Sequence, residues 1–153
     1  MLLTGLLPDI STDPAIETAT DSIEAGRSGV IVAPVGVRPP LLAAVSSRAA
    51  TPLVVLTATG RDAETLTNAL ASWIPGVAML PAWETLPHER LSPQVDTMAR
   101  RIAVLRRLVH PVEDDDSAGP ISVLVVPIRA FLQPIISGLA DLEPVRVRTG
   151  DIL

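Results

Sequence analysis

The chain has 153 residues and a mass of 16.1 kDa, the size of one ordinary domain with a single core. Its residues are 48% apolar and 19% charged, a balance that excludes disorder for the chain as a whole. The 17 acidic and 12 basic residues leave a net charge of -5, so no global field attracts nucleic acid or an anionic membrane. Any such contact has to be local.

The residue types that are missing exclude several kinds of chemistry. All 12 basic residues are arginine, which excludes a Schiff base and the phosphate-binding lysine of a nucleotide loop. Cysteine is absent, and the two histidines, His88 and His110, cannot build a zinc site alone. No apolar run approaches the roughly 20 residues of a membrane span. We therefore expect a cytoplasmic protein without a metal or thiol site.

Predicted strands and helices alternate along the chain. Residues 1–10 look like an extended lead-in that packs on the body, and a helix follows over 13–25, where Asp13 and Pro14 mark its start. Short apolar runs predict buried strands over 29–33, 52–56, 77–80 and 121–126. Helices are predicted over 41–49, 61–73 and 93–110, a broken helical turn over 129–135 and a half-exposed strand over 145–148. This order, with few aromatic residues, favours an α/β fold built on a three-layer parallel sheet with right-handed crossovers.

The helix predicted over 93–110 has the clearest periodicity in the chain. Ser92 is its expected cap, with Pro93 in the first turn. An apolar stripe is expected to comprise Val95, Met98, Ile102, Leu105 and Val109, with Arg100 and Arg107 opposite it and Arg101 and Arg106 at its flanks. One face of the helix is then basic.

Two turns follow predicted strands, where nucleotide-binding proteins hold phosphate. The turn at 33–40 has one glycine and no lysine, and Pro39 and Pro40 lack the backbone N–H that would bind phosphate, so it predicts no working nucleotide loop. The turn at 57–61 is better suited to an anion, through Thr57, Thr59, Gly60 and Arg61. Capping of the next helix by Thr59 explains the same residues without a ligand.

The loop over 83–93 is the densest group of polar residues. Glu84, His88 and Glu89 would serve as an acid–base set in an enzyme. A zinc-protease motif is excluded, because residue 92 is serine and residue 93 is proline. The alternative is a structural loop pinned by Trp83 and Pro87 that joins the third strand to the next helix.

The order of elements and this loop resemble a known family. The stretches that carry the resemblance are PLVVLTATGRDAETLTNALASW, LPAWETLPHERLSPQVDTMARRIAVLRRLVHP, ISVLVVPIRAFLQP and LEPVRVRTGD. They resemble the N-terminal region of bacterial transcription-repair coupling factor, the Mfd family, over about residues 29–153. The motif residues are Trp83, Glu84, Thr85, Leu86, Pro87, Ser92, Pro93, Asp96 and Arg101. The absence of lysine and the Arg, Ala and Pro bias resemble an actinobacterial version.

The resemblance implies a helicase-like first domain over residues 1–132, similar to the damage-verification protein UvrB, whose nucleotide site is degenerate. Residues 133–153 would begin a second domain of the type that contacts the repair ATPase UvrA, so that the chain resembles a truncated or split product. The full-length family is an ATP-dependent DNA translocase that displaces stalled RNA polymerase and recruits nucleotide excision repair. Its ATP and magnesium belong to regions absent here, so the resemblance implies no catalytic, cofactor or metal residue in this segment.

Three hypotheses about function remain at the level of sequence. The leading one is a non-catalytic interaction and autoinhibitory module whose partners are UvrA, other domains of its own full-length factor and, through missing regions, RNA polymerase. The second is a small enzyme that uses Glu84, His88 and Glu89. The third is a weak nucleic-acid-binding module, with no membrane role, whose contacts would be Thr57, Thr59, Gly60, Arg61, Arg100 and Arg107.

Overall fold

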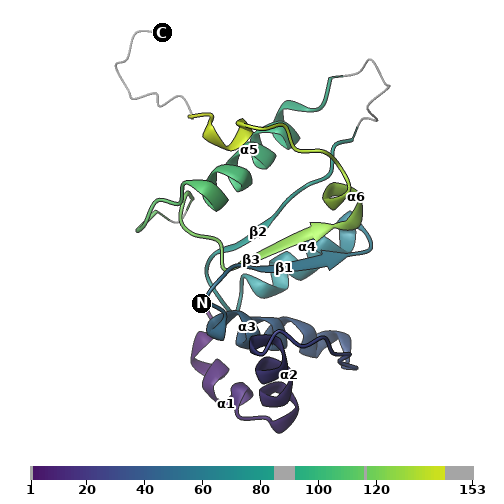
Figure 1. Cartoon of the computed structure of the whole chain (residues 1–153), viewed down its shortest axis with the longest axis vertical. Coiled ribbons are helices and arrows are strands. Elements are labelled where there is room, and N and C mark those ends of the chain that lie inside the picture. The colour runs from purple at the N-terminus through teal and green to yellow at the C-terminus, as the bar shows by residue number, and fades with distance from the viewer. Residues whose placement is uncertain (1, 85–91, 116, 144–153) are drawn as a thin grey trace.

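A computed structural model describes residues 2–84, 92–115 and 117–143 and shows three parallel strands with helices packed around them (Figure 1). The elements in chain order are η1 (Thr4–Leu6), α1 (Leu7–Ser11), α2 (Pro14–Glu24), η2 (Val35–Val37), α3 (Arg38–Arg48), β1 (Leu53–Thr57), α4 (Gly60–Leu70), β2 (Val77–Met79), α5 (Val95–Val109), β3 (Val123–Pro127), α6 (Ile128–Phe131) and η3 (Leu139–Asp141). The predicted α/β class and parallel sheet are confirmed. The strand predicted at 145–148 lies outside the described residues.

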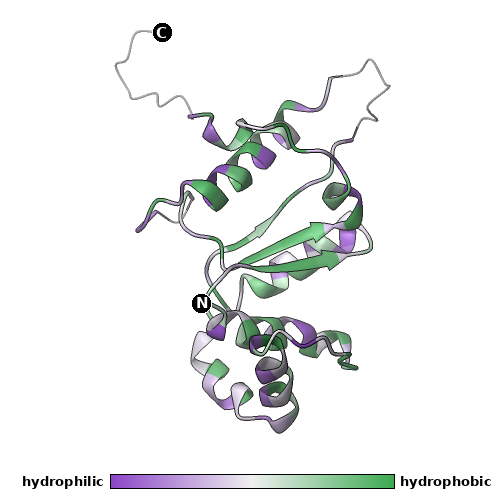
Figure 2. Ribbon diagram, in the orientation of Figure 1, coloured by the Kyte–Doolittle hydropathy of each residue, from purple (hydrophilic) through white to green (hydrophobic). Residues whose placement is uncertain are grey.

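The sheet has the order β1-β3-β2, so the strand latest in the sequence is central. Leu53 of β1 and Val77 of β2 both align with Val123 of β3. Every residue of β3 is buried, and Figure 2 shows the strand as hydrophobic along its length. A continuous apolar run is what a central parallel strand requires, because helices cover both of its faces.

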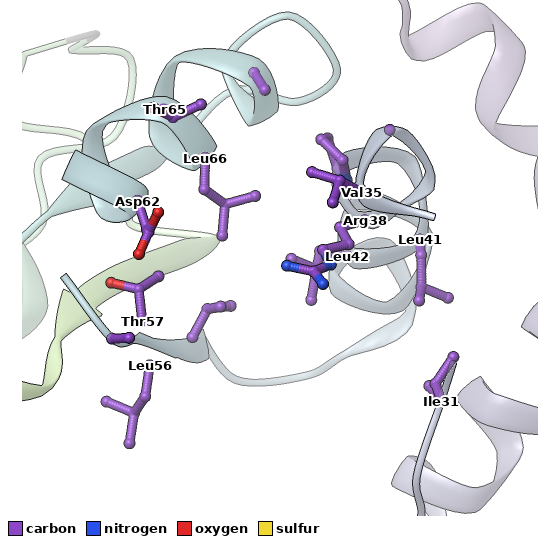
Figure 3. A pocket seen from close by; sticks show the side chains of 15 residues that line it. Ile31, Val35, Arg38, Leu41, Leu42, Leu56, Thr57, Asp62, Thr65 and Leu66 are labelled. Atoms are coloured by element: carbon purple, nitrogen blue, oxygen red, sulfur yellow. The ribbon is translucent and has the colours of Figure 1, made fainter. Parts of the chain in front are cut away.

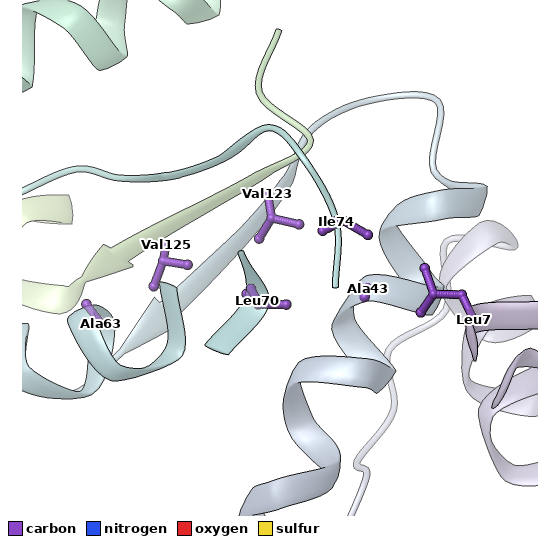
Figure 4. Close-up of a cluster of buried hydrophobic side chains, with 7 residues drawn as sticks. All are labelled: Leu7, Ala43, Ala63, Leu70, Ile74, Val123 and Val125. Atoms are coloured by element: carbon purple, nitrogen blue, oxygen red, sulfur yellow. The ribbon is translucent and has the colours of Figure 1, made fainter. Parts of the chain in front are cut away.

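One face of the sheet packs on α4 and on the N-terminal helices. Val123 and Val125 of β3 lie in a cluster with Leu70 of α4, and the cluster continues to Ala43 of α3 and Leu7 of α1 (Figure 4). The lead-in predicted over 1–10 thus packs on the body as predicted, but the predicted extended conformation is wrong, because residues 4–11 are helical. Pro8 lies in the first turn of a helix, where its missing N–H has no partner to lose, and Leu7 is buried.

The opposite face packs on α5, where Val104 joins Leu124 and Val126 of β3 in a second cluster. The stripe predicted on this helix is rotated from the buried one. Val95 is 76% exposed, whereas the buried residues are Thr97, Arg101, Val104 and Leu105. Ser92 is not the cap either, because the helix begins at Val95 and Ser92 is exposed.

The strand predicted over 29–33 is absent, because these residues form neither helix nor strand and the side chains of Val30 and Val32 are more than nine-tenths exposed. β1 is consequently an edge strand. Its Val54 and Leu56 are about half exposed, although the prediction had this strand buried on both faces.

Gly76 makes the turn between α4 and β2 possible. Its φ is +72°, and a Cβ there would lie 2.7 Å from the Ser122 hydroxyl oxygen and 2.9 Å from the Pro120 carbonyl oxygen. The backbone of Gly76 accepts a hydrogen bond from Ser122 N–H at 2.8 Å, which ties this turn to the start of β3. Only glycine combines this φ with so close an approach.

Candidate functional site

The backbone of Trp83, just beyond β2, is held by the side chain of Gln133. Trp83 N–H donates to Gln133 Oε1 at 2.8 Å, and Gln133 Nε2 donates back to the Trp83 carbonyl oxygen at 3.3 Å. A side-chain amide thus pairs with one residue of main chain as a neighbouring strand would. The start of the 83–93 loop is fixed to the segment that follows α6.

The Trp83 ring lies on a buried arginine. The Arg101 guanidinium carbon is 4.5 Å from the ring centroid, and Arg101 Nη1 donates to the Pro81 carbonyl oxygen at 2.6 Å. Arg101 is fully buried, and its Nε has no hydrogen-bond partner within the described part of the chain. Burial lowers the pKa of Arg101, but guanidinium remains charged in proteins. The ring face therefore supplies electrostatic compensation for this cation.

Glu84 is bound to the start of α5. The Thr97 hydroxyl donates to Glu84 Oε1, and this hydrogen bond is the main reason that the pKa of the Glu84 carboxyl lies below its ordinary value. The Gln94 backbone N–H also contributes to that lowering. Arg129 Nη2 donates to the Glu84 carbonyl oxygen at 3.2 Å. The Glu84 side chain thereby ties the residues that follow β2 to the first turn of α5.

These contacts give the motif residues a structural task. Trp83, Glu84 and Arg101 come together as one cluster, in which Arg101 reaches from α5 to the residues that follow β2. Asp96 lies apart from this cluster and pairs with Arg100 on the exposed side of α5, at 2.7 Å. Thr85, Leu86, Pro87, His88 and Glu89 lie outside the described residues, whereas Ser92 is exposed and Pro93 is partly buried.

Gln133, Arg129 and Thr97 belong to the cluster and were not predicted from the sequence. Gln133 is 50 residues from its partner, and no local pattern signals such a pairing. Thr97 stands on a helix whose apolar residues suggested a different buried face. We call the set of Trp83, Glu84, Thr97, Arg101, Arg129 and Gln133 the Trp83 clamp.

The turn at 57–61 uses its polar groups internally. Thr59 caps α4 by accepting from Asp62 N–H at 3.1 Å, and its hydroxyl donates to Asp62 Oδ2 at 2.8 Å. The Thr57 hydroxyl donates to the Thr59 carbonyl oxygen at 3.0 Å. The Asp62 carboxylate thus supplies negative charge where an anion would bind. Arg61 is exposed and makes no ion pair with a described residue.

The basic face predicted for α5 is dispersed. Arg101 is buried, and Arg107 Nε donates to the Gly119 carbonyl oxygen at 2.8 Å. Arg106 Nη1 donates to the Leu142 carbonyl oxygen at 3.2 Å. Arg100 pairs with Asp96, so each of the four arginines lies in a different environment. They do not form one stripe that follows a phosphate backbone.

The segment after α6 returns to the C-terminal half of α5. His110 Nε2 lies 2.7 Å from Asp141 Oδ1, and Arg106 Nη2 lies 3.8 Å from a Glu143 carboxylate oxygen. These pairs are exposed and each contributes little to stability, about 0 to 1 kcal/mol. They orient η3 on the helix.

A cavity of about 630 Å³ lies between α3 and the carboxyl end of β1 (Figure 3). Its lining is mostly apolar, with Asp62 and Thr57 on one wall and Arg38 on the opposite wall. The turn at 33–40 borders it as the 3₁₀ helix η2 and the first turn of α3, so the glycine-rich cradle of a nucleotide loop is not formed there.

The described residues contain no group of three or more His, Cys, Asp or Glu side chains placed to hold a metal ion. Within the same ranges, no helix combines the length and apolar character that a bilayer crossing demands.

Comparison with known proteins identifies relatives. The chain is 46% identical over 123 residues to the transcription-repair-coupling factor of Mycobacterium bovis, and equally identical to that of Mycobacterium tuberculosis. The chain shares ancestry with a segment of transcription-repair-coupling factor. The match covers 79% of this chain but only 10% of each relative, so the chain spans a small part of the length of these factors. No protein-family model matches the chain.

Proposed function

We propose that this chain is a non-catalytic interaction module of a transcription-coupled repair factor. The observation that carries the proposal is the 46% identity to mycobacterial transcription-repair-coupling factors over most of the chain. The relatives are about ten times longer than the matched segment, so their overall activity belongs to a much larger protein. A role in transcription-coupled repair follows for this chain as one segment of such a protein.

The module is best understood as a helicase-like domain of the UvrB type with a degenerate nucleotide site, over residues 1–132. The parallel sheet and its flanking helices support this assignment. The 33–40 turn supports the loss of the site, because Pro39 and Pro40 cannot donate backbone N–H groups to phosphate. Residues 133–153 begin a second domain in this proposal, and the segment needs no cofactor of its own.

The Trp83 clamp argues for a structural role of the loop over a catalytic one. Glu84 is already bound to the Thr97 hydroxyl, and a carboxyl with a lowered pKa is a poor general acid at neutral pH. The enzyme hypothesis requires His88 and Glu89, which lie outside the described residues, and it stays untested. We propose that the clamp holds the loop in place as part of a surface for protein partners.

The partners of such a module are the repair ATPase UvrA and the other domains of a full-length factor. The experiment adds the chain in trans to a transcription-repair-coupling factor that lacks the matching segment, and measures its ATPase rate. Inhibition that saturates with the chain supports an autoinhibitory module. An unchanged ATPase rate, with no binding to UvrA in a biosensor assay, contradicts the proposal.

The same preparation tests for a nucleotide site. Isothermal titration with ATP and magnesium is expected to show no saturable heat from the chain alone. A dissociation constant below about 1 mM, which corresponds to a binding free energy of about -4 kcal/mol, would contradict the degenerate site. Duplex DNA is the matched second titrant, and we expect at most weak binding that disappears at physiological salt, because the net charge is -5.

A further inference from the structure

The helix α2 is attached to the rest of the fold by very little buried surface. Of its residues, all of which the structure describes, Thr20 alone is buried, and the Thr20 hydroxyl donates within the helix, to the Ile16 carbonyl oxygen at 2.7 Å. The neighbouring helix α3 buries four residues, and Figure 1 shows α3 lying between α2 and the sheet. Burial of apolar surface therefore contributes little to holding α2 in place.

The chain on both sides of α2 leaves this helix free to move. Two exposed residues, Thr12 and Asp13, join it to α1, and on its other side every residue from Ile23 to Val32 is exposed. Residues 27–34 form neither helix nor strand. Within the described part of the chain, no backbone hydrogen bond joins residues 14–33 to another helix or to the sheet. We call α2, with these two hinges, the α2 arm.

One arginine of α3 supplies the contact that the backbone lacks. Arg48 Nε donates to Glu24 Oε1 at 2.8 Å and Arg48 Nη2 donates to Glu24 Oε2 at 3.0 Å, so the guanidinium binds this carboxylate through two hydrogen bonds. Arg48 Nη2 also donates to Asp21 Oδ1 at 2.9 Å. The hydrogen bonds with Glu24 and then Asp21 raise the pKa of Arg48. Among the described residues, every side-chain hydrogen bond between α2 and another element involves Arg48.

The charge of the N-terminal region explains why this arginine matters. The first 26 residues contain five carboxylates and no basic side chain, so they carry the whole formal net charge of -5. Glu17, Asp21 and Glu24 are spaced by four and three residues, which places them on one side of α2, where they repel one another. Arg48 neutralises part of this charge. A helix of 11 residues is also marginal alone in water, so α2 is expected to lose its helical structure when it leaves α3.

We propose that the α2 arm is an electrostatic latch, which Arg48 holds closed on α3 and which opens as a unit, without unfolding of the sheet, when this contact is removed or screened. Opening uncovers the side of α3 that faces away from the sheet. The latch responds to ionic strength, because ion pairs between exposed side chains weaken as the salt concentration rises. This inference concerns the fold of the chain and does not depend on the proposed function.

Amide hydrogen exchange of the whole chain, followed by mass spectrometry, tests the latch. The amides of α2 are expected to exchange about 100-fold or more faster than those of β3, which is buried along its length. Arg48→Gln is expected to accelerate exchange in α2 by about three- to tenfold, the range that a few exposed ion pairs allow. Glu24→Gln removes the same paired hydrogen bonds from the α2 side, and we expect an acceleration in the same range.

Arg100→Gln is the matched control, because Arg100 also forms an exposed ion pair, with Asp96 on α5, and this variant is expected to leave exchange in α2 unchanged. The difference between the wild type and Arg48→Gln is expected to shrink as sodium chloride rises from about 0.05 to 1 M. Far-UV circular dichroism shows that each variant is folded. The proposal is overturned if α2 is protected as strongly as β3, if neither Arg48→Gln nor Glu24→Gln accelerates its exchange, if Arg100→Gln accelerates it equally, or if salt leaves the difference unchanged.

Discussion

Replacing Trp83 by alanine is expected to destabilise the fold by about 3 to 4 kcal/mol. The ring is half-buried, and about 100 Å² of lost burial at about 25 cal/mol per Å² accounts for about 2.5 kcal/mol. The contact with Arg101, 4.5 Å from the ring centroid, adds about 1 kcal/mol or more because the cation is desolvated. In this variant the buried Arg101 guanidinium has no aromatic ring beside it. For a domain of this size the loss corresponds to a fall of about 10 °C in Tm.

Guanidinium denaturation followed by far-UV circular dichroism measures this effect. A double-mutant cycle with Arg101→Met isolates the ring–cation contact, and a coupling of about 1 to 2 kcal/mol is expected because the two side chains touch. Phe131→Ala is the matched control, because Phe131 is aromatic but 57% exposed, and it is expected to have a much smaller effect. A loss below about 1 kcal/mol for Trp83→Ala, or strictly additive changes in the cycle, would refute the clamp.

Three other predictions follow from local geometry. Gly76→Ala is expected to destabilise by several kcal/mol in thermal melts, because its φ is +72° and its Cβ would lie 2.9 Å from a backbone oxygen; an unchanged Tm would contradict this. Asp13→Ala is expected to lower the free energy of unfolding by about 1 kcal/mol, because it removes the cap of α2. Ser92→Ala is expected to change stability little, because Ser92 is not the cap of α5. Equal denaturation midpoints for the two variants would show that Asp13 does not act as a cap. The lowered pKa of Glu84 stabilises the fold above the ordinary carboxyl pKa of about 4.3, and that stabilisation is lost as the pH falls through the lowered value. Thr97→Val removes the main cause, so its denaturation midpoint should fall less than that of the wild type between pH 6 and pH 3, and an identical fall would refute the role of Thr97.

Elements with strong local patterns were predicted well. An apolar run predicts β3, and the capping residue Thr59 marks the start of α4; both signals are local in the sequence. The strand expected over 29–33 has the same kind of apolar run. A run shows only that a segment suits a strand, and the described sheet consists of β1, β2 and β3 without these residues.

The buried face of α5 could not be predicted from hydrophobicity, because its interior neighbours are partly polar. Arg101 points inward to the Pro81 carbonyl oxygen and the Trp83 ring, and Thr97 points to a carboxylate. A stripe assigned from apolar residues alone leaves Arg101 at its flank and does not include Thr97. The role of Gln133 could not be predicted for another reason. Its hydrogen bond with Trp83 joins residues 50 positions apart, and no periodicity in the sequence marks such a pair.

The double hydrogen bond between Gln133 and the Trp83 main chain has a practical consequence for choosing where a truncated form of this protein should end. The boundary proposed between residues 132 and 133 separates the amide from the backbone that it holds. A shortened chain that stops at Leu132 would keep all three strands, yet would release the first residue of the loop and free the ring above Arg101 to move. Any segmentation of related proteins for expression should therefore extend past Gln133, and preferably past Glu143, which lies 3.8 Å from Arg106.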